Sequence, residues 1–159
     1  RNQGYLINGR QTAGNFFMLE GVFSSELKNI IHSELEKYRT HFIHSKEGFI
    51  TNWPSNYYLY GWLISMRSGG ELTPHMHDAG WLTCSIYINI PSKKESNNGN
   101  LVLGIENEKD VIDRSKIRNK TINVSTGALC MFPSSLLHHT VPFKSKEERI
   151  VLAFDLVPE

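Results

Sequence analysis

Two histidines stand two residues apart in the stretch TPHMHDAGW, and their spacing suits the binding of a metal ion. His75 and His77 follow a proline, and Asp78 comes directly after them. In an extended chain, side chains two residues apart point to the same face, so both imidazoles can approach one cation. The pair predicts a metal site if another part of the chain supplies a third ligand.

A second pair, His138 and His139, is the source from which we expect this third ligand. The pair lies in the stretch GALCMFPSSLLHHTVPF, after an apolar segment that ends near Phe132. Arg149 follows 11 residues after His138 and opens the apolar segment RIVLAF. Its guanidinium either reaches water or binds an anion inside the fold. A planar guanidinium in a dry site is suited to a carboxylate, because such charge-assisted hydrogen bonds contribute about 1.5–3 kcal/mol.

The elements that must position these residues begin with one amphipathic helix over residues 24–42. Ser24 or Ser25 is expected to cap this helix, and Glu26 in its first turn suits the helix dipole. Apolar residues at three- and four-residue spacing predict its buried face. They are Leu27, Ile30, Ile31, Leu35 and Tyr38.

From Phe49 onward the sequence is typical of short strands, because aromatic and β-branched segments alternate with Gly, Pro, Asn and Ser. The predicted strands are 57–66, 81–90, 99–105, 120–125, 127–132 and 148–157. No helical segments separate them, so parallel βαβ units are not expected. The pattern predicts a mainly β fold, a sandwich or jelly-roll barrel with the N-terminal helix packed outside it.

Length and charge limit the classes of protein and partner. A chain of 159 residues predicts one domain, 1–159, with a helical part at 1–48 and a jelly-roll core at 49–159. Because 17 basic residues nearly balance 16 acidic ones, we expect no nucleic-acid and no membrane partner. The chain also has no apolar run of about 18 residues. It begins at Arg1 without a signal peptide or methionine, so we expect a segment of a longer protein.

The two cysteines indicate the redox environment. Cys84 and Cys130 each lie inside an apolar, strand-like segment. This placement is more typical of two buried thiols than of a disulfide. We therefore expect a reducing compartment and a cytoplasmic location.

Taken together, these segments resemble the 2-oxoglutarate/Fe(II)-dependent oxygenases, most closely the prolyl-hydroxylase-related branch. The resemblance covers residues 57–158 and depends on PHMH, TCSIYINIP, GNLVLGIE, GALCMFPSSLLHHTVPF and ERIVLAFDL. It implies a double-stranded β-helix that uses Fe(II) and 2-oxoglutarate. It further implies a dioxygenase that hydroxylates a C–H bond of an unidentified substrate, a small molecule or a protein side chain, with release of succinate and CO2.

The resemblance also implies roles for individual residues. His75, His77 and His138 would be the metal ligands and hence the catalytic residues. Arg149 would bind the distal carboxylate of 2-oxoglutarate, and Tyr87 in SIYINIP would present its hydroxyl to the same carboxylate.

The second ligand position departs from the family pattern, which has Asp or Glu where this chain has His77. In a regular strand Asp78 would point away from His75 and His77, but a bulge could turn it inward as the alternative ligand. His139 is the alternative to His138, which is preferred because the length of FPSSLLH matches the family.

The sequence alone also allows three alternatives outside this family. Gly69, six residues before His75, together with His77 fits the opening of a cupin signature. The glutamate that this signature requires next is missing, because Trp81 and Leu82 stand there. A cupin-type metal enzyme without 2-oxoglutarate is one alternative. A non-catalytic module that binds metal or 2-oxoglutarate is another, and a structural barrel is a third.

Large apolar residues near the histidines could form the rim of a substrate-binding mouth or pack in the core. They are Tyr58, Tyr60, Trp62, Met66 and Trp81.

Overall fold

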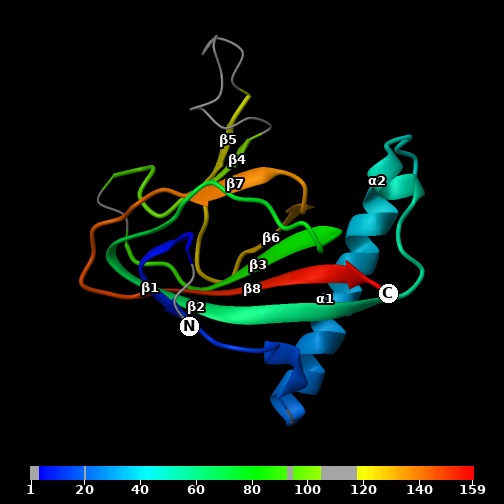
Figure 1. The fold of residues 1–159 in the computed structure, drawn as a ribbon, viewed down its shortest axis with the longest axis horizontal. Helices are drawn as coiled ribbons and strands as arrows, with labels where there is room; N and C mark the ends of the chain where they lie inside the picture. The colour runs from blue at the N-terminus through cyan, green and yellow to red at the C-terminus, as the bar shows by residue number, and fades with distance from the viewer. Residues whose placement is uncertain (1–3, 20, 93–94, 105–117) are drawn as a thin grey trace.

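The computed structural model describes residues 4–19, 21–92, 95–104 and 118–159, without the side chains of residues 22–24. The described chain forms two antiparallel sheets with helices at one end (Figure 1). The major sheet contains, in spatial order, β1 (Leu6–Gln11), β2 (Tyr57–Leu72), β8 (Arg149–Pro158), β3 (Leu82–Asn89) and β6 (Leu129–Pro133). The minor sheet contains β5 (Lys120–Ile122), β4 (Leu101–Gly104) and β7 (Leu137–Thr140). The helical elements are η1 (Phe16–Met18), α1 (Val22–His41) and α2 (Gly48–Thr51).

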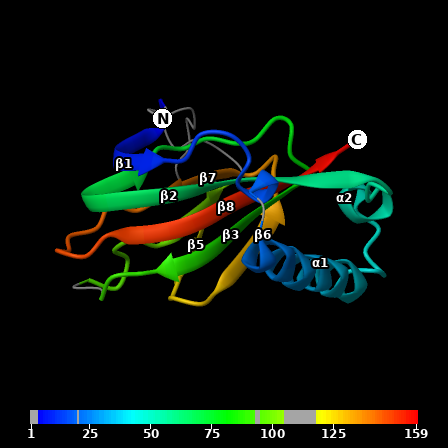
Figure 2. The same ribbon diagram turned by 90° about the horizontal axis from the view of Figure 1, so that it is seen from below.

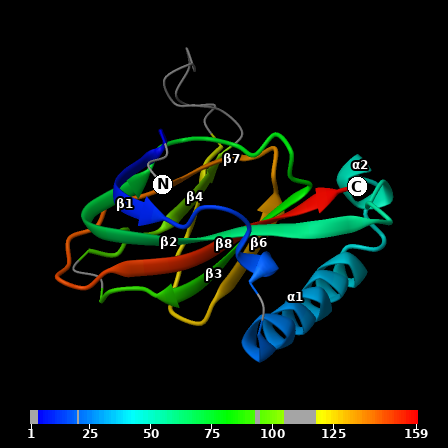
Figure 3. The same cartoon turned by 60° about the horizontal axis from the view of Figure 1, so that its bottom comes forward.

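Helix α1 packs on the outer face of the major sheet, as Figure 3 shows, and this confirms the predicted mainly β fold with an outer helix. Ile31 and Leu35 are each only 1% exposed and contact the main apolar core. The other fully buried members of this core are Phe17, Leu59, Leu82, Cys84, Leu152, Phe154 and Leu156. Burial of apolar surface contributes about 25 cal/mol per Å2. The burial of Ile31 and Leu35 in this core therefore stabilises the packing of the helix against the sheet.

Three details of the helix prediction are wrong. Ile30 is 59% exposed, because successive helical residues are 100° apart and Ile31 already faces the sheet. The helix also begins at Val22 with Gly21 at its N-cap, so Ser25 lies inside the first turn and does not cap it. Because of this earlier start, Glu26 lies beyond the first turn, which contains no acidic residue to interact with the helix dipole. The side chain of Ser24 lies outside the described part of the chain.

Strand β8 lies between β2 and β3, and alternation along it divides its side chains between two covered faces. The residues that face the space between the sheets are Arg149, Val151, Ala153 and Asp155. The residues that face α1 are Leu152, Phe154 and Leu156. Because both faces are buried, the strand has the nearly continuous apolar sequence that made it easy to predict.

The N-terminal segment closes one edge of the major sheet. Strand β1 pairs with the distal half of β2, next to which it lies in Figure 2. Beyond β1, the Asn15 amide donates to the carbonyl of Leu59 at 2.8 Å and accepts from the amide of Gly61 at 2.9 Å. Phe17 then packs directly over Gly61, where an added Cβ would lie 2.6 Å from the Phe17 ring. A side chain at position 61 would therefore displace η1.

Six predicted strands correspond to β2, β3, β4, β5, β6 and β8, although β2 extends further, to Leu72. The sequence prediction missed β1 and β7. The two cysteines are free thiols, as expected, with Cys84 buried and Cys130 half-buried. Among the helices that the structure describes, none is long and apolar enough to cross a membrane.

Candidate metal centre

Two of the three predicted histidine ligands are brought together by backbone pairing. His75 and His138 form an antiparallel bridge, with N–H···O distances of 3.1 Å and 2.9 Å in the two directions. Directly opposite residues of such a pair place their side chains on the same face. The ring centroids of these two histidines are 4.3 Å apart. A contact between residues 63 positions apart in the sequence is thus fixed by main-chain hydrogen bonds.

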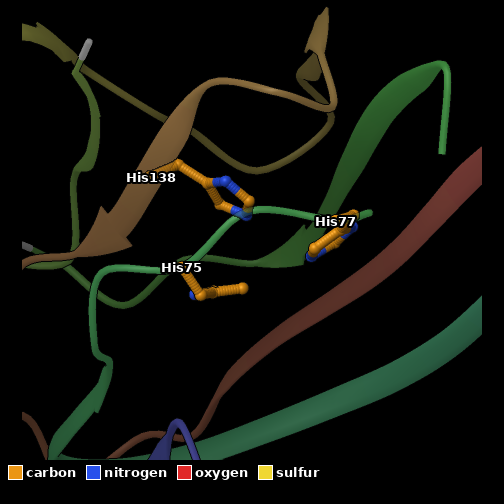
Figure 4. A group of neighbouring side chains, drawn as sticks. All are labelled: His75, His77 and His138. Atoms are coloured by element: carbon orange, nitrogen blue, oxygen red, sulfur yellow. The ribbon is translucent and has the colours of Figure 1, made fainter. Parts of the chain in front are cut away.

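His77 approaches the pair from the loop between β2 and β3. Its backbone amide donates to the carbonyl of Ser134 at 3.1 Å, which ties this loop to the turn before β7. Its ring centroid lies 5.2 Å from that of His75 and 5.0 Å from that of His138. One ring nitrogen of each histidine lies within 4.8 Å of those of the other two, and Figure 4 shows the three rings converging.

The two alternative ligands lie outside this group. Asp78 is exposed, and it stands in a turn that begins directly after His77. His139 is the neighbour of His138 on β7, so its side chain points to the opposite face of that strand. Within the described residues, the group of possible metal ligands therefore contains His75, His77 and His138, and it contains neither alternative.

Hydrogen bonds at the Nδ1 atoms prepare the three histidines to bind a metal through Nε2. His75 Nδ1 lies 2.7 Å from the carbonyl oxygen of Thr73, and His138 Nδ1 lies 3.1 Å from that of Leu136. A carbonyl oxygen can only accept, so both histidines carry their proton on Nδ1 and leave a lone pair on Nε2. Such a partner behind the ring is the usual arrangement for metal-ligating histidines. The donor set fits a divalent cation.

Burial favours the neutral, metal-binding form of His75 and His138. Burial and the neighbouring His75 lower the pKa of His138 to about 3. Burial also lowers the pKa of His75, against the opposing effect of its hydrogen bond to Thr73. Because a metal competes with protons for the imidazole lone pair, a lowered pKa removes this competition at neutral pH.

The partner of His77 Nδ1 is a carboxylate, which the sequence analysis did not single out. The two oxygens of Asp155 lie 2.8 Å and 2.9 Å from this nitrogen. The side-chain hydroxyl of Thr83 lies 2.8 Å from the same carboxylate. A signal was present in the sequence, since Asp155 is the one charged residue within the apolar run 150–157. An acid in such a strand is rarely buried without a specific partner.

The predicted anion-binding residues lie in the same cavity as the histidines. Arg149 is only 3% exposed, and its Nε donates to the carbonyl of Gly99 at 3.3 Å. Its guanidinium carbon lies 5.3 Å from the ring centroid of Tyr87, which is 1% exposed and whose pKa is raised by burial. In the part of the chain that the structure describes, no carboxylate forms an ion pair with Arg149. A buried cation of this kind is suited to an incoming carboxylate.

The cavity extends between the two sheets from the histidines to the arginine. It is lined by Trp62, Ile64, Leu72, His75, His77, Thr83, Ser85, Tyr87, Leu101, His138, Thr140, Arg149, Val151 and Ala153. Of the five residues considered for the mouth, Trp62 lines this cavity, while Tyr58 and Tyr60 are exposed. Met66 is fully buried, and Trp81 stacks on Phe49, so these two belong to the packing of the fold.

Structural comparison shows the same jelly-roll fold in three solved structures, two of them prolyl hydroxylases. A Pseudomonas putida prolyl-4-hydroxylase has a TM-score of 0.58 at 11% identity, over 95% of this chain and 71% of that one. A viral collagen prolyl hydroxylase of Paramecium Bursaria Chlorella virus-1, in complex with 2-oxoglutarate, has a TM-score of 0.55 at 17% identity, over 96% and 80%. HygX of Streptomyces hygroscopicus, with nickel and 2-oxoglutarate bound, has a TM-score of 0.57 at 13% identity, over 99% and 72%. These similarities confirm the predicted double-stranded β-helix.

Sequence comparison gives the family. No curated protein sequence is significantly similar to this chain. The family model described as "Putative 2OG-Fe(II) oxygenase" matches residues 60–155, which is more than half of the chain and includes all three histidines, Tyr87 and Arg149. The alternative of a cupin-type metal enzyme without 2-oxoglutarate does not agree with this match, because the matched family is described by its use of 2-oxoglutarate. The chain belongs to the 2-oxoglutarate/Fe(II) oxygenases and is an enzyme that depends on both cofactors.

Proposed function

We propose that His75, His77 and His138 hold Fe(II) through their Nε2 atoms, and that Arg149 and Tyr87 bind the distal carboxylate of 2-oxoglutarate. When bound, Fe(II) and 2-oxoglutarate reduce O2 and insert one of its oxygen atoms into a C–H bond, with release of succinate and CO2. The observation that supports this assignment best is the shared cavity. It has three converging imidazoles at one end and, at the other, a buried guanidinium that forms no ion pair with any carboxylate of the described residues.

The protein residues contribute orientation and the exclusion of water. Arg149 is held by Gly99 and lies against the Tyr87 ring, so its planar fork has few orientations available to a carboxylate. Apolar side chains of both sheets, among them Leu101 and Val151, surround this end of the cavity. In such a dry site the charge-assisted contact to a carboxylate is stronger than in water.

The structural similarities suggest the chemical class of the substrate. We propose that the enzyme hydroxylates a carbon of a small molecule or of a peptide side chain, since two of the similar structures are prolyl hydroxylases. Trp62 lies 5.5 Å from His77 and 6.1 Å from Tyr60, measured between ring centroids, and these rings form an apolar approach to the metal site. We further propose that residues 1–159 form a single domain and that its two free thiols reflect a cytoplasmic location.

The metal assignment can be tested by substituting the two adjacent histidines separately. Binding of Mn(II), a stand-in that is stable in air, is measured by calorimetry on chelator-treated protein. His138→Ala should abolish binding, because it removes one of three ligands. His139→Ala is the matched control and should retain it. The opposite pattern would assign the ligand to His139 and refute the geometry given above.

The cosubstrate assignment can be tested in the same way with two arginines. An anaerobic absorption spectrum of the Fe(II)-loaded protein is recorded while 2-oxoglutarate is added, and succinate formation is then measured in air. Arg149→Leu should leave Mn(II) affinity unchanged and weaken 2-oxoglutarate binding by about 10- to 150-fold, the equivalent of a lost charge-assisted contact. Arg67→Leu removes an exposed arginine and serves as the control. Equal cosubstrate affinity in both variants would exclude Arg149 from this role.

A further inference from the structure

The carboxylate of Asp155 stands directly behind one of the three proposed metal ligands. Its two oxygens lie 2.8 Å and 2.9 Å from His77 Nδ1, so one N–H of the ring faces both of them. Asp155 is 7% exposed, and it belongs to β8, whereas His77 belongs to the loop before β3. His75 and His138, in contrast, are backed by neutral carbonyl groups. The centre is therefore asymmetric, with one formal charge behind one ligand.

We propose that Asp155 supplies, through the imidazole of His77, the negative charge that this metal centre lacks among its direct ligands. This inference rests on the proposed metal site. In the two-histidine, one-carboxylate arrangement, a protein anion touches the cation. Here the candidate ligands among residues 4–19, 21–92, 95–104 and 118–159 are three imidazoles, with no carboxylate in the group. The carboxylate is provided by Asp155 instead of by residue 77, and the imidazole ring of His77 lies between this carboxylate and the proposed cation.

Hydrogen bonds from its surroundings hold the carboxylate of Asp155 in a fixed orientation. The Thr83 hydroxyl lies 2.8 Å from Asp155 Oδ1 and 2.8 Å from the hydroxyl of Ser134, so it can donate to the first while it accepts from the second. Thr83 and Ser134 are 2% and 0% exposed. A buried carboxylate is tolerated only where such donors satisfy it. These residues make Asp155 a positioning and charge-supplying residue that acts through His77.

The backbone of the loop is adapted to the same carboxylate. A Cβ added to Gly80 would lie 2.5 Å from Ser134 Oγ and 3.1 Å from Asp155 Cγ. Only glycine lets the chain pass this close to the network. The loop that carries His77 therefore needs a glycine at position 80 in order to pass close to Asp155 and Ser134. This requirement indicates that the contact between the loop and Asp155 is a specific one.

A carboxylate behind a ligating imidazole fixes its tautomer and makes it a better electron donor to the cation. Loss of such a partner typically weakens metal binding about 10- to 100-fold. The effect should be specific to this carboxylate, because Asp78, which follows His77 in the sequence, is exposed and lies outside the group of possible ligands.

The first experiment measures Mn(II) affinity of chelator-treated protein by calorimetry, with folding checked by circular dichroism. Asp155→Asn removes the charge and is nearly the same size, and it should weaken Mn(II) binding about 10- to 100-fold. Asp78→Asn removes the same formal charge from the adjacent exposed position and should leave the affinity within about twofold. Equal affinities in Asp155→Asn and the native protein would overturn the proposal.

A double-mutant cycle separates the supply of charge from a merely structural role. His77→Asp restores a carboxylate to the ligand set, so the further change Asp155→Asn should then cost less than about threefold in Mn(II) affinity. A residue that only holds the loop in place would cost the same in both backgrounds, and this outcome would also overturn the proposal. Thr83→Val provides a second route if Asp155→Asn does not fold. It removes a donor to the carboxylate, and its severalfold loss should likewise disappear in the His77→Asp protein.

The same data distinguish failure of this inference from failure of the proposed metal site. If native protein binds Mn(II), and His138→Ala does not, the site stands whatever Asp155 contributes. If native protein binds no Mn(II), the metal site itself is wrong, and the inference falls with it.

Discussion

Acid should destabilise the metal-free protein, because His75 and His138 are buried in the neutral form. Burial and the neighbouring His75 lower the pKa of His138 from 6.5 to about 3 in the folded chain. On unfolding, the imidazole returns to its ordinary pKa. Between these two pKa values the unfolded state binds a proton that the native state does not. The free energy of unfolding therefore has its full value above about pH 6.5 and decreases as the pH falls toward 3.

The size of this effect follows from the pKa difference. Each pKa unit corresponds to about 1.36 kcal/mol, so acidification from pH 7.5 to 5.0 should cost about 2 kcal/mol through His138 alone. The pKa of His75 is also lowered, chiefly by burial, so its contribution has the same sign. For a domain of this length, 2 kcal/mol corresponds to a fall in Tm of about 4–8 °C.

The assay is urea unfolding of chelator-treated protein at pH 7.5 and at pH 5.0. His138→Gln replaces the imidazole with a group that does not titrate, so the difference between the two pH values should shrink by about 2 kcal/mol. His44→Gln alters an exposed histidine and should leave the difference unchanged. The comparison uses differences between pH values, so a uniformly less stable variant remains informative. An equal acid-induced loss in His138→Gln and native protein would refute the burial argument.

Three further outcomes are expected from the packing and from the metal site. Leu35→Ala should lower the free energy of unfolding by about 2–5 kcal/mol in urea melts, whereas exposed Ile30→Ala should change it by less than about 0.5; similar values would contradict the assigned helix face. Gly61→Ala should cost about 1–3 kcal/mol, because its methyl group would meet Phe17, and a neutral result would mean that η1 packs elsewhere. Mn(II) at 100 times its Kd should raise the free energy of unfolding by about 2.7 kcal/mol, a gain that EDTA removes; no gain would argue against a native metal site.

The sequence allowed prediction of the elements whose pattern is local. Strands β2, β3 and β8 are long and rich in aromatic and branched aliphatic residues, and α1 repeats its apolar residues at helical spacing. Strands β1 and β7 were missed for physical reasons. The short strand LHHT has no apolar alternation, and it is held by pairing with β4 and by the bridge to His75. The polar sequence of β1 is likewise a strand because β2 offers it an edge.

The proximity of the candidate ligands could be predicted because their signal combines spacing with order along the chain. The structure brings together the same three histidines, Arg149 and Tyr87 that the sequence indicated. The sequence could not show why Asp78 lies outside the site, because its position depends on a turn that begins directly after His77 and not on a regular strand. Sequence spacing could not reveal that turn.

Asp155 was not predicted because its role exists only through tertiary pairing. It lies 78 residues from His77 in the sequence, and it reaches that ring because β8 pairs with β3, where Asp155 stands opposite Thr83. Comparison with the family motif along the chain shows only that position 77 has a histidine where the family has an acid. The sheet register instead places an acid, Asp155, directly behind the imidazole of His77. An HxH pattern in this family should therefore be judged together with the residue that backs its second histidine, since loss of the direct carboxylate need not mean loss of its charge.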